Sequence, residues 1–451
     1  MIITLQDLQK KPDLATAIKD TTEAWLASAE LKAMQNAYKY YLGENPKLKA
    51  LRDRIVADTG FTLNLRPEQP VYSNFFGKIT NQHVGHLLKH PLTFDEGVVD
   101  KFGAGFQHTV RDMTQDAYIR GVSWGLWDGE KLTHLPAENF IPIYDEESGA
   151  IVAGISFKRL REDLPWNYYF YEREGISRFR QAAGNDGKVK PDGKLELISE
   201  RKPYRHTSRP FLTGEVIESV ENPDTFPIRP LHTNKENRSE LILPIKTQIN
   251  AYDLLKTGYI DETLKSKFIY WLISGYSGNI EELIKIKEIA QKLGIIAEQG
   301  GNSKIMPQTL EPPHNAHEKI MKELKESIYG DAMAFDSDNL GGRASVAVEA
   351  IRASQFNEEI KIGIMWSELE KFIRDIMTVA GIRSEVVRYT PFKLTTGEEA
   401  RSRSLQGWVD RGLPLEIAIK LDPLVSADID VDELKKVLAT EALGYGNDDE
   451  A

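Results

Sequence analysis

The stretch from Phe226 to Gly278 carries the most information about the fold. It begins Phe226-Pro-Ile-Arg-Pro-Leu-His-Thr-Asn234, continues with Ser239-Glu-Leu-Ile-Leu-Pro-Ile-Lys-Thr-Gln-Ile-Asn-Ala-Tyr-Asp253, and ends Phe268-Ile-Tyr-Trp-Leu-Ile-Ser-Gly-Tyr-Ser-Gly278. This order predicts an extended Pro-rich segment, a polar turn, a long helix to about residue 265 and a short apolar strand closed by glycines. Pro244 suits the first turn of that helix, where its missing N–H costs nothing.

The chain after this stretch alternates helices with short strands. Apolar spacing and glycine or proline punctuation predict helices at 280–293, 314–329 and 345–380, strands at 268–273, 294–298, 304–306 and near 385–392, and two or three short helices within 397–451. A polar loop of about fifteen residues, 331–345, lies between two strong helices. Loops of this length inside a helical unit are commonly functional or disordered.

The chain before this stretch predicts helices followed by a sheet. Helical spacing covers 14–40, about 73–89 and 102–120, with Ser73 or Asn74 as a cap and Gly121 as a stop. Period-two patterns and turn residues then predict an antiparallel sheet with strands at 123–127, 132–135, 140–144, 151–160, 166–172, 175–180 and 194–199. The fold class is therefore α+β, mainly helical.

Composition limits the class of protein. The chain has 451 residues, enough for several structural units, and no cysteine, which excludes disulfides and thiolate metal sites. No apolar run approaches the roughly 18 residues that span a bilayer, and the first residues do not resemble a signal peptide, so we expect a cytoplasmic site of synthesis. The net charge of −11 disfavours a protein that grips nucleic acid, yet it suits a conduit along which DNA slides without sticking.

Candidate chemical motifs are incomplete. His83, His86 and His90 share one helix face and could hold a metal, but a packed or solvated helix face is the simpler interpretation. Gly77-Lys78 lacks the glycine five residues earlier that a phosphate-binding loop requires, because position 72 is Tyr. We find no catalytic constellation, and we expect no enzyme activity, no metal and no cofactor.

Two alternatives stay open on the residues alone. One is a cytosolic hydrolase or nucleotide-handling enzyme with an unrecognised site around His134, Glu138 and Asp145. The other is a helical scaffold that binds a protein partner. The absence of any complete motif counts against the enzyme, and the order of two helices, a polar loop and a long helix counts against a generic scaffold.

An ordered series of weak motifs resembles the SPP1-like family of tailed-bacteriophage portal proteins. The motifs are Tyr40-Tyr41-Leu42-Gly43-Glu-Asn-Pro46, Asn74-Phe-Phe-Gly-Lys-Ile-Thr80 to Gly85-His-Leu-Leu-Lys-His-Pro91, Leu135-Pro136 with Phe140-Ile-Pro-Ile-Tyr144 and Asp145, Phe226-Pro227 to Tyr252-Asp253, Gly341-Gly342-Arg343-Ala344-Ser345, and Gly407-Trp-Val-Asp-Arg-Gly-Leu-Pro414. The fifth departs from the Ser-Gly-x-Ala-Leu motif of many relatives. The match covers most of residues 38–435.

The resemblance implies a portal-type architecture assembled into a ring. Its regions would be a wing part at 1–235, a first stem helix at 236–265, a clip at 266–312, a second stem helix at 313–330, a tunnel loop at 331–345, a long wing helix with strands at 346–396, and a short helical crown at 397–451. Such a ring, usually of twelve subunits, would form the channel for DNA packaging and ejection at one capsid vertex.

The resemblance also implies functional residues and partners. The DNA-channel loop would present Asp331, Asp336, Asp338, Asn339 and Arg343. The clip would face partners with Tyr276, Asn279, Glu281 and Glu282. Expected partners are non-specifically held double-stranded DNA, the terminase large subunit, a head-completion or adaptor protein, and the major capsid and scaffold proteins. The protein would be in the virion, and in the host cytoplasm during assembly.

Overall fold

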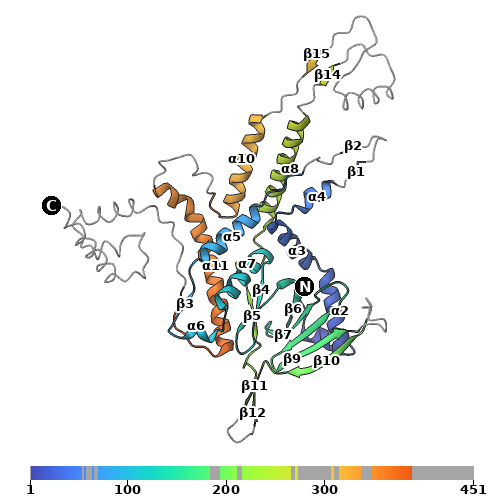
Figure 1. The fold of residues 1–451 in the computed structure, drawn as a ribbon, viewed down its shortest axis with the longest axis vertical. Helices are drawn as coiled ribbons and strands as arrows, with labels where there is room; N and C mark the ends of the chain where they lie inside the picture. Colours follow the sequence, from blue (N-terminus) through green and yellow to red (C-terminus); the bar gives the residue numbers. More distant parts are fainter. Residues whose placement is uncertain are drawn as a thin grey trace, which may run out of the picture.

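The computed structural model describes residues 2–52, 55–56, 63–64, 70–182, 193–210, 216–265, 270–272, 306–308, 314–336 and 348–388. Within them the protein mixes helices with antiparallel sheet, as the α+β prediction requires. Two long helices project together from a body of helices and strands (Figure 1). The predicted helix at 280–293, the strand at 294–298 and the whole of 397–451 lie outside the described residues.

The N-terminal helices differ from the single helix expected over 14–40. Helix α1 spans Leu5–Gln9, and two helices follow, α2 (Leu14–Ala27) and α3 (Ala29–Tyr41). Ser28 interrupts them because its backbone is extended and its hydroxyl accepts a hydrogen bond from Leu31 N (3.1 Å), which starts a new helix. Pro46, predicted only as a stop, begins α4 (Pro46–Arg52).

The next helices form the centre of the body. Asn74 caps α5 (Phe75–Leu87) as predicted. The helix expected from residue 102 is instead a short α6 (Val98–Lys101) and α7 (Phe106–Arg120). Gly105 has φ of +81°, a left-handed conformation that cannot continue a helix, and therefore sets the later start.

The predicted antiparallel sheet is confirmed. Five strands lie in the order β10-β9-β8-β7-β6, and their bounds are β6 (Phe140–Tyr144), β7 (Ile151–Lys158), β8 (Asn167–Glu172), β9 (Gly175–Gln181) and β10 (Leu195–Lys202). Ile18 and Trp25 of α2 pack with Ile155 and Phe170 in one apolar cluster, which fixes the helix against the sheet.

The Pro-rich segment that begins at Phe226 forms part of a second sheet. Strand β13 (Ile228–Leu231) pairs antiparallel with β4 (Ser123–Trp127), which also pairs with β5 (Leu132–Leu135). The 3-10 turn η1 (Ala137–Asn139) links β5 to β6. Sequence patterns missed this pairing and the hairpin of β11 (Arg205–Pro210) and β12 (Val216–Glu221).

The projecting helices and the long helix agree with prediction. They are α8 (Leu243–Lys265), α10 (His314–Asp331) and α11 (Val348–Ala380). Short strands β14 (Tyr270–Leu272) and β15 (Met306–Gln308) pair antiparallel at the far end of the α8–α10 pair (Figure 1). Further two-residue strands pair as β1 (Ile55–Val56) with β2 (Leu63–Asn64) and β3 (Thr93–Phe94) with β16 (Val387–Arg388).

One large apolar core joins these helices. Its buried members include Phe76 of α5, Met113 of α7, Ile249 of α8, Ile328 of α10 and Phe372 of α11. Burying each such side chain contributes about 1.5–3 kcal/mol. The bases of α8 and α10 are therefore packed into the same core as α5, α7 and α11.

Candidate functional site

The base of the α8–α10 pair is the first part of the candidate site. The two helices run antiparallel: Gln248 Nε2 donates to Asp331 Oδ2 (2.7 Å), and farther along the rings of Tyr259 and His317 lie 5.3 Å apart. Tyr329 of α10 meets Phe75 of α5 edge to face at 6.1 Å. These contacts, one at the base of the pair and one farther along it, hold α8 and α10 together.

A buried carboxylate fixes α8 to the body. Asp253 is fully buried and accepts hydrogen bonds from Ser73 N (3.0 Å) and Asn45 Nδ2 (2.8 Å). Burial raises the pKa of Asp253, and the hydrogen bonds from Ser73 and Asn45 oppose that rise. About one helical turn farther along α8, Thr257 Oγ1 accepts a hydrogen bond from Val71 N (3.1 Å). Side chains far apart in sequence thus set the direction in which α8 leaves the body.

A tight turn follows α10 and leads toward residues 337–347, which lie outside the described residues. Met333 has φ of +55°, uncommon for a residue with a side chain. Ala332 N and Ala334 N donate to the carbonyls of Ile328 (3.1 Å) and Tyr329 (2.9 Å). These bonds satisfy the last carbonyls of α10 while the chain reverses.

Helix α5 holds this turn from the other side. His83 is fully buried, with Nδ1 2.8 Å from the Tyr118 hydroxyl and Nε2 3.3 Å from the Met333 carbonyl. A carbonyl can only accept, so Nε2 carries the proton and Nδ1 accepts from Tyr118. Burial lowers the pKa of His83 to about 3, which keeps the ring neutral at physiological pH. Gln82 Nε2 donates to the Phe335 carbonyl (3.2 Å).

Of the five residues expected to face the DNA channel, Asp331 and Asp336 are described, and α8 and α10 hold them. Asp331 is the last residue of α10 and accepts from Gln248. Asp336 forms an ion pair with Lys325 (3.0 Å), and its side chain is 7% exposed. The other expected loop residues, Asp338, Asn339 and Arg343, and the expected clip residues, Tyr276, Asn279, Glu281 and Glu282, lie outside the described residues.

Contacts of the buried residues Glu358 and Lys361 connect α11 to the same region. Glu358 of α11 contacts His86 Nδ1 of α5, and Lys361 pairs with Glu240 Oε1 (2.6 Å), just before α8. Sequence inspection found no nearby carboxylate that could join His83, His86 and His90 in a metal site. The carboxylate that contacts His86 belongs to Glu358, about 270 residues later in the chain. In the described part of the chain no group of three potential metal ligands converges.

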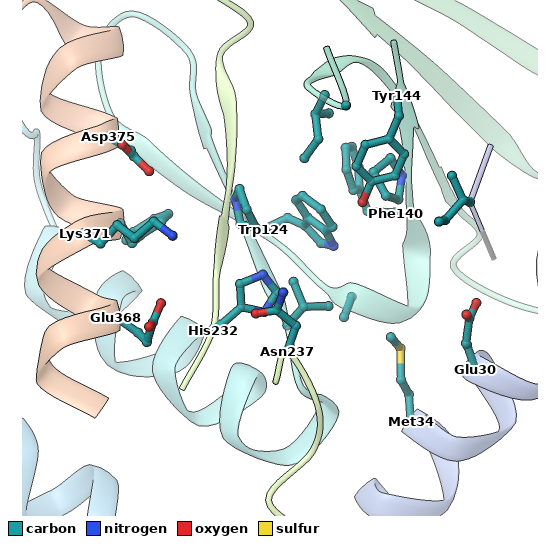
Figure 2. Close-up of a pocket in the computed structure, with 18 of the residues that line it drawn as sticks. Glu30, Met34, Trp124, Phe140, Tyr144, His232, Asn237, Glu368, Lys371 and Asp375 are labelled. Carbon is teal, nitrogen blue, oxygen red and sulfur yellow. The ribbon is translucent and has the colours of Figure 1, made fainter. Parts of the chain in front are cut away.

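A cleft lies between α11, α3 and the sheets (Figure 2). Its volume is about 630 Å³, its floor includes Trp124 and Phe140, and its sides carry Lys371 and Asp375 of α11. His232 Nδ1 donates to the Gly121 carbonyl (2.9 Å), and burial lowers the pKa of that histidine. Among the described residues that line the cleft there is no serine, threonine or cysteine to act as a nucleophile.

The residues of the enzyme alternative have structural partners and do not line that cleft. Glu138 Oε1 accepts from Arg120 Nε (2.7 Å), and His134 Nε2 lies 3.3 Å from Asp116 Oδ2. Arg120 also contacts Asp116, so these four side chains form one network that joins α7 to β5 and η1. Asp145 accepts from Ser148 N (2.9 Å) and closes the β6–β7 turn.

Comparison with known proteins assigns the family. The model of the family described as "Phage portal protein, SPP1 Gp6-like" matches residues 27–381. The chain therefore belongs to the SPP1 Gp6-like family of phage portal proteins, as the ordered motifs indicated. Among curated proteins no sequence matches the chain. In the described residues no helix is long and apolar enough to cross a membrane.

Two solved structures are similar to the chain at low sequence identity. One is a chain in the neck of an empty gene transfer agent particle, with 10% identity and a TM-score of 0.39, covering 75% of this chain and 86% of that one. The other belongs to the virion of a native gene transfer agent particle, with 12% identity and a TM-score of 0.38, covering 75% of this chain and 85% of that one.

Proposed function

We propose that this chain is the portal subunit of a phage or phage-like particle, and that copies close into a ring at one capsid vertex through which DNA is packaged and ejected. Membership of the portal family over residues 27–381 is the observation that carries the proposal. The family is structural, so no enzyme activity is implied. The force for packaging comes from a separate terminase ATPase.

The regions expected from the resemblance fit the elements of the chain. Residues 236–265 and 313–330 serve as stem helices, and residues 266–312 between them serve as the clip. The antiparallel α8–α10 pair and the β14–β15 pairing at its far end support this division (Figure 1). Residues 1–235 and 346–396 form the wing, and 397–451 form the crown.

The stem suits a wall that DNA passes without being gripped. Residues 235–265 contain five basic and five acidic side chains. Two of the acids, Glu240 and Asp253, are used inside the subunit by Lys361 and by Ser73, so they do not face DNA. The five basic and three acidic side chains that remain favour contacts between neighbouring stems, and such contacts would occupy part of this small positive excess before it could hold phosphates.

The tunnel loop is proposed to begin after Asp336. The turn at 332–336 is held by His83, Gln82 and Lys325. The proposed loop therefore starts from a position that is fixed relative to α5 and α10. Asp338 then repels the DNA backbone, and Arg343 offers one weak, replaceable phosphate contact per subunit. This combination allows sliding in both directions while it helps retain packed DNA.

The proposed clip meets the terminase large subunit during packaging and a head-completion or adaptor protein afterwards. The major capsid and scaffold proteins surround the ring. Tyr276, Asn279, Glu281 and Glu282 are the proposed clip contacts. Twelve subunits are the proposed ring number.

A loop replacement tests the channel role. Residues 337–345 are exchanged for a Gly-Ser linker of equal length, which leaves the turn at 332–336 intact. The matched control replaces the exposed β7–β8 turn at 160–163 in the same way. We expect lower packaging or poorer DNA retention in the loop variant alone. Normal packaging and retention in both variants would show that the loop has no such role.

A further inference from the structure

The exposed side of α11 carries a stripe of large apolar residues. Phe356, Ile360 and Ile364 are 60%, 40% and 39% exposed, and their spacing of four places them on one helix face. Met365 and Leu369, in contrast, are buried on the opposite face in the core. This stripe has no cover within the described residues of its own chain.

A hollow that is lined partly by apolar side chains lies at the junction of α8 and α4. Its volume is about 200 Å³, and its lining is Lys47, Leu48, Thr247, Asn250, Ala251 and Leu254. Leu254 is 51% exposed, and Leu243 on the same face of α8 is 71% exposed. A cavity of about 150 Å³ accommodates benzene, so this hollow is large enough for a phenylalanine ring.

The two surfaces cannot meet within one subunit. In Figure 1, α11 lies on one side of the body, whereas α4 lies on the other side, beyond α8. A protrusion and a recess on opposite sides of one chain define a heterologous contact, in which each copy binds the next in a head-to-tail order. Such contacts produce a ring when the rotation closes.

The charges next to the two surfaces are complementary. Glu359 is exposed beside the stripe, whereas Glu358 and Lys361 nearby are buried and paired. Lys47 and Lys49 of α4 are exposed beside the hollow. Lysines beside the hollow that face the exposed Glu359 favour this pairing, whereas two α11 helices in contact would bring two Glu359 carboxylates together.

We infer that the partner of the α11 stripe is a second copy of this chain, with Phe356 of one copy seated in the α4–α8 hollow of the next. The inference rests on the proposed function, because it assigns the contact that closes the ring. It makes the stem of one subunit the support for the long helix of its neighbour.

The lack of cysteine makes a crosslinking test selective. Two single variants, Phe356→Cys and Leu254→Cys, are mixed, assembled and treated with a short thiol crosslinker. We expect heterodimers that contain one chain of each variant. Leu160→Cys, at a position that is 91% exposed and outside both surfaces, replaces Leu254→Cys as the matched control and yields none.

A second variant measures the strength of the contact. Phe356→Asp changes an exposed residue, so the subunit should keep its fold and its circular-dichroism spectrum. We expect the concentration for half-assembly to rise about 30-fold or more, the typical effect of losing one central aromatic residue from an interface. An unchanged half-assembly concentration overturns the inference.

Electron microscopy of the same mixtures separates failure of the inference from failure of the proposed function. Closed rings without the 356–254 crosslink, or with Phe356→Cys chains joined only to each other, overturn the interface and leave the portal proposal standing. Crosslinked open filaments support the interface and contradict the ring. Uncrosslinked single chains contradict both.

Discussion

Replacement of His83 by glutamine tests how the turn after α10, at the base of the proposed tunnel loop, is held. The imidazole accepts from Tyr118 and donates to the Met333 carbonyl, and the Tyr118 side chain is buried. Glutamine offers one acceptor and one donor at similar reach, so His83→Gln keeps a partner for each group while it removes the titrating ring.

The pH dependence follows from the lowered pKa of His83. Its folded-state pKa is about 3, against an ordinary value of 6.5. Above pH 6.5 the ring is neutral in both states and contributes no pH dependence. Below pH 6.5 only the unfolded chain takes the proton, so the free energy of unfolding falls by about 1.4 kcal/mol per pH unit until the pH nears 3. Between pH 7.5 and pH 5.0 this loss is about 2 kcal/mol.

Urea unfolding followed by tryptophan fluorescence measures this loss. The wild-type chain, His83→Gln and the control His108→Gln, whose histidine is 81% exposed, are compared at pH 7.5 and pH 5.0 and at equal protein concentration. The wild-type chain and His108→Gln should lose about 2 kcal/mol more stability at pH 5.0 than His83→Gln. Equal losses in all three proteins would refute a buried neutral His83.

Three further substitutions test other contacts that hold the helices and turns of the body in place. Asp253→Ala strands the Ser73 donors, and the free energy of unfolding in urea should fall by about 2–4 kcal/mol; a change below about 0.5 kcal/mol would contradict a role in holding α8. Lys361→Met leaves the Glu240 carboxylate buried without its cation, and the same assay should show a loss of about 3 kcal/mol; an unchanged urea midpoint would contradict that pairing. Gly121→Ala places a Cβ 2.6 Å from backbone atoms at a φ of +92°, so the melting temperature should drop by several degrees; an unchanged melting temperature would contradict the geometry of this turn.

Sequence patterns were most reliable where local rules decide the structure. The antiparallel strands from β4 to β10 and the helices α5, α8, α10 and α11 lie within a few residues of their predicted bounds. Each follows from a period, a cap or a breaker within one segment, such as the Asn74 cap of α5. The family resemblance came from the order of weak motifs, and the family match over residues 27–381 confirms it.

Sequence patterns failed where distant residues decide the structure. Ser28 is compatible with a helix interior, and only the packing of α2 against the sheet and of α3 against α7 shows why the chain bends there. Ile228-Arg-Pro-Leu231 has little alternation to mark a strand, yet it pairs with β4 across about 100 residues. Such pairings depend on tertiary contacts that no local window contains.

The residues that hold the turn at 332–336 were missed for the same reason. His83 was considered as a metal ligand because of its spacing from His86 and His90, whereas its partners Tyr118 and Met333 come from α7 and from the turn after α10. One sequence signal was available: a histidine on the apolar side of a helix needs a buried partner. The identity of that partner required the fold.

Single-particle cryo-electron microscopy of the purified, assembled chain tests the central claim most directly. The account predicts closed rings with an axial passage wide enough for duplex DNA, walls formed by α8 and α10, and residues 337–345 at the narrowest point. Compact single chains, or closed dimers without any axial opening, would contradict it.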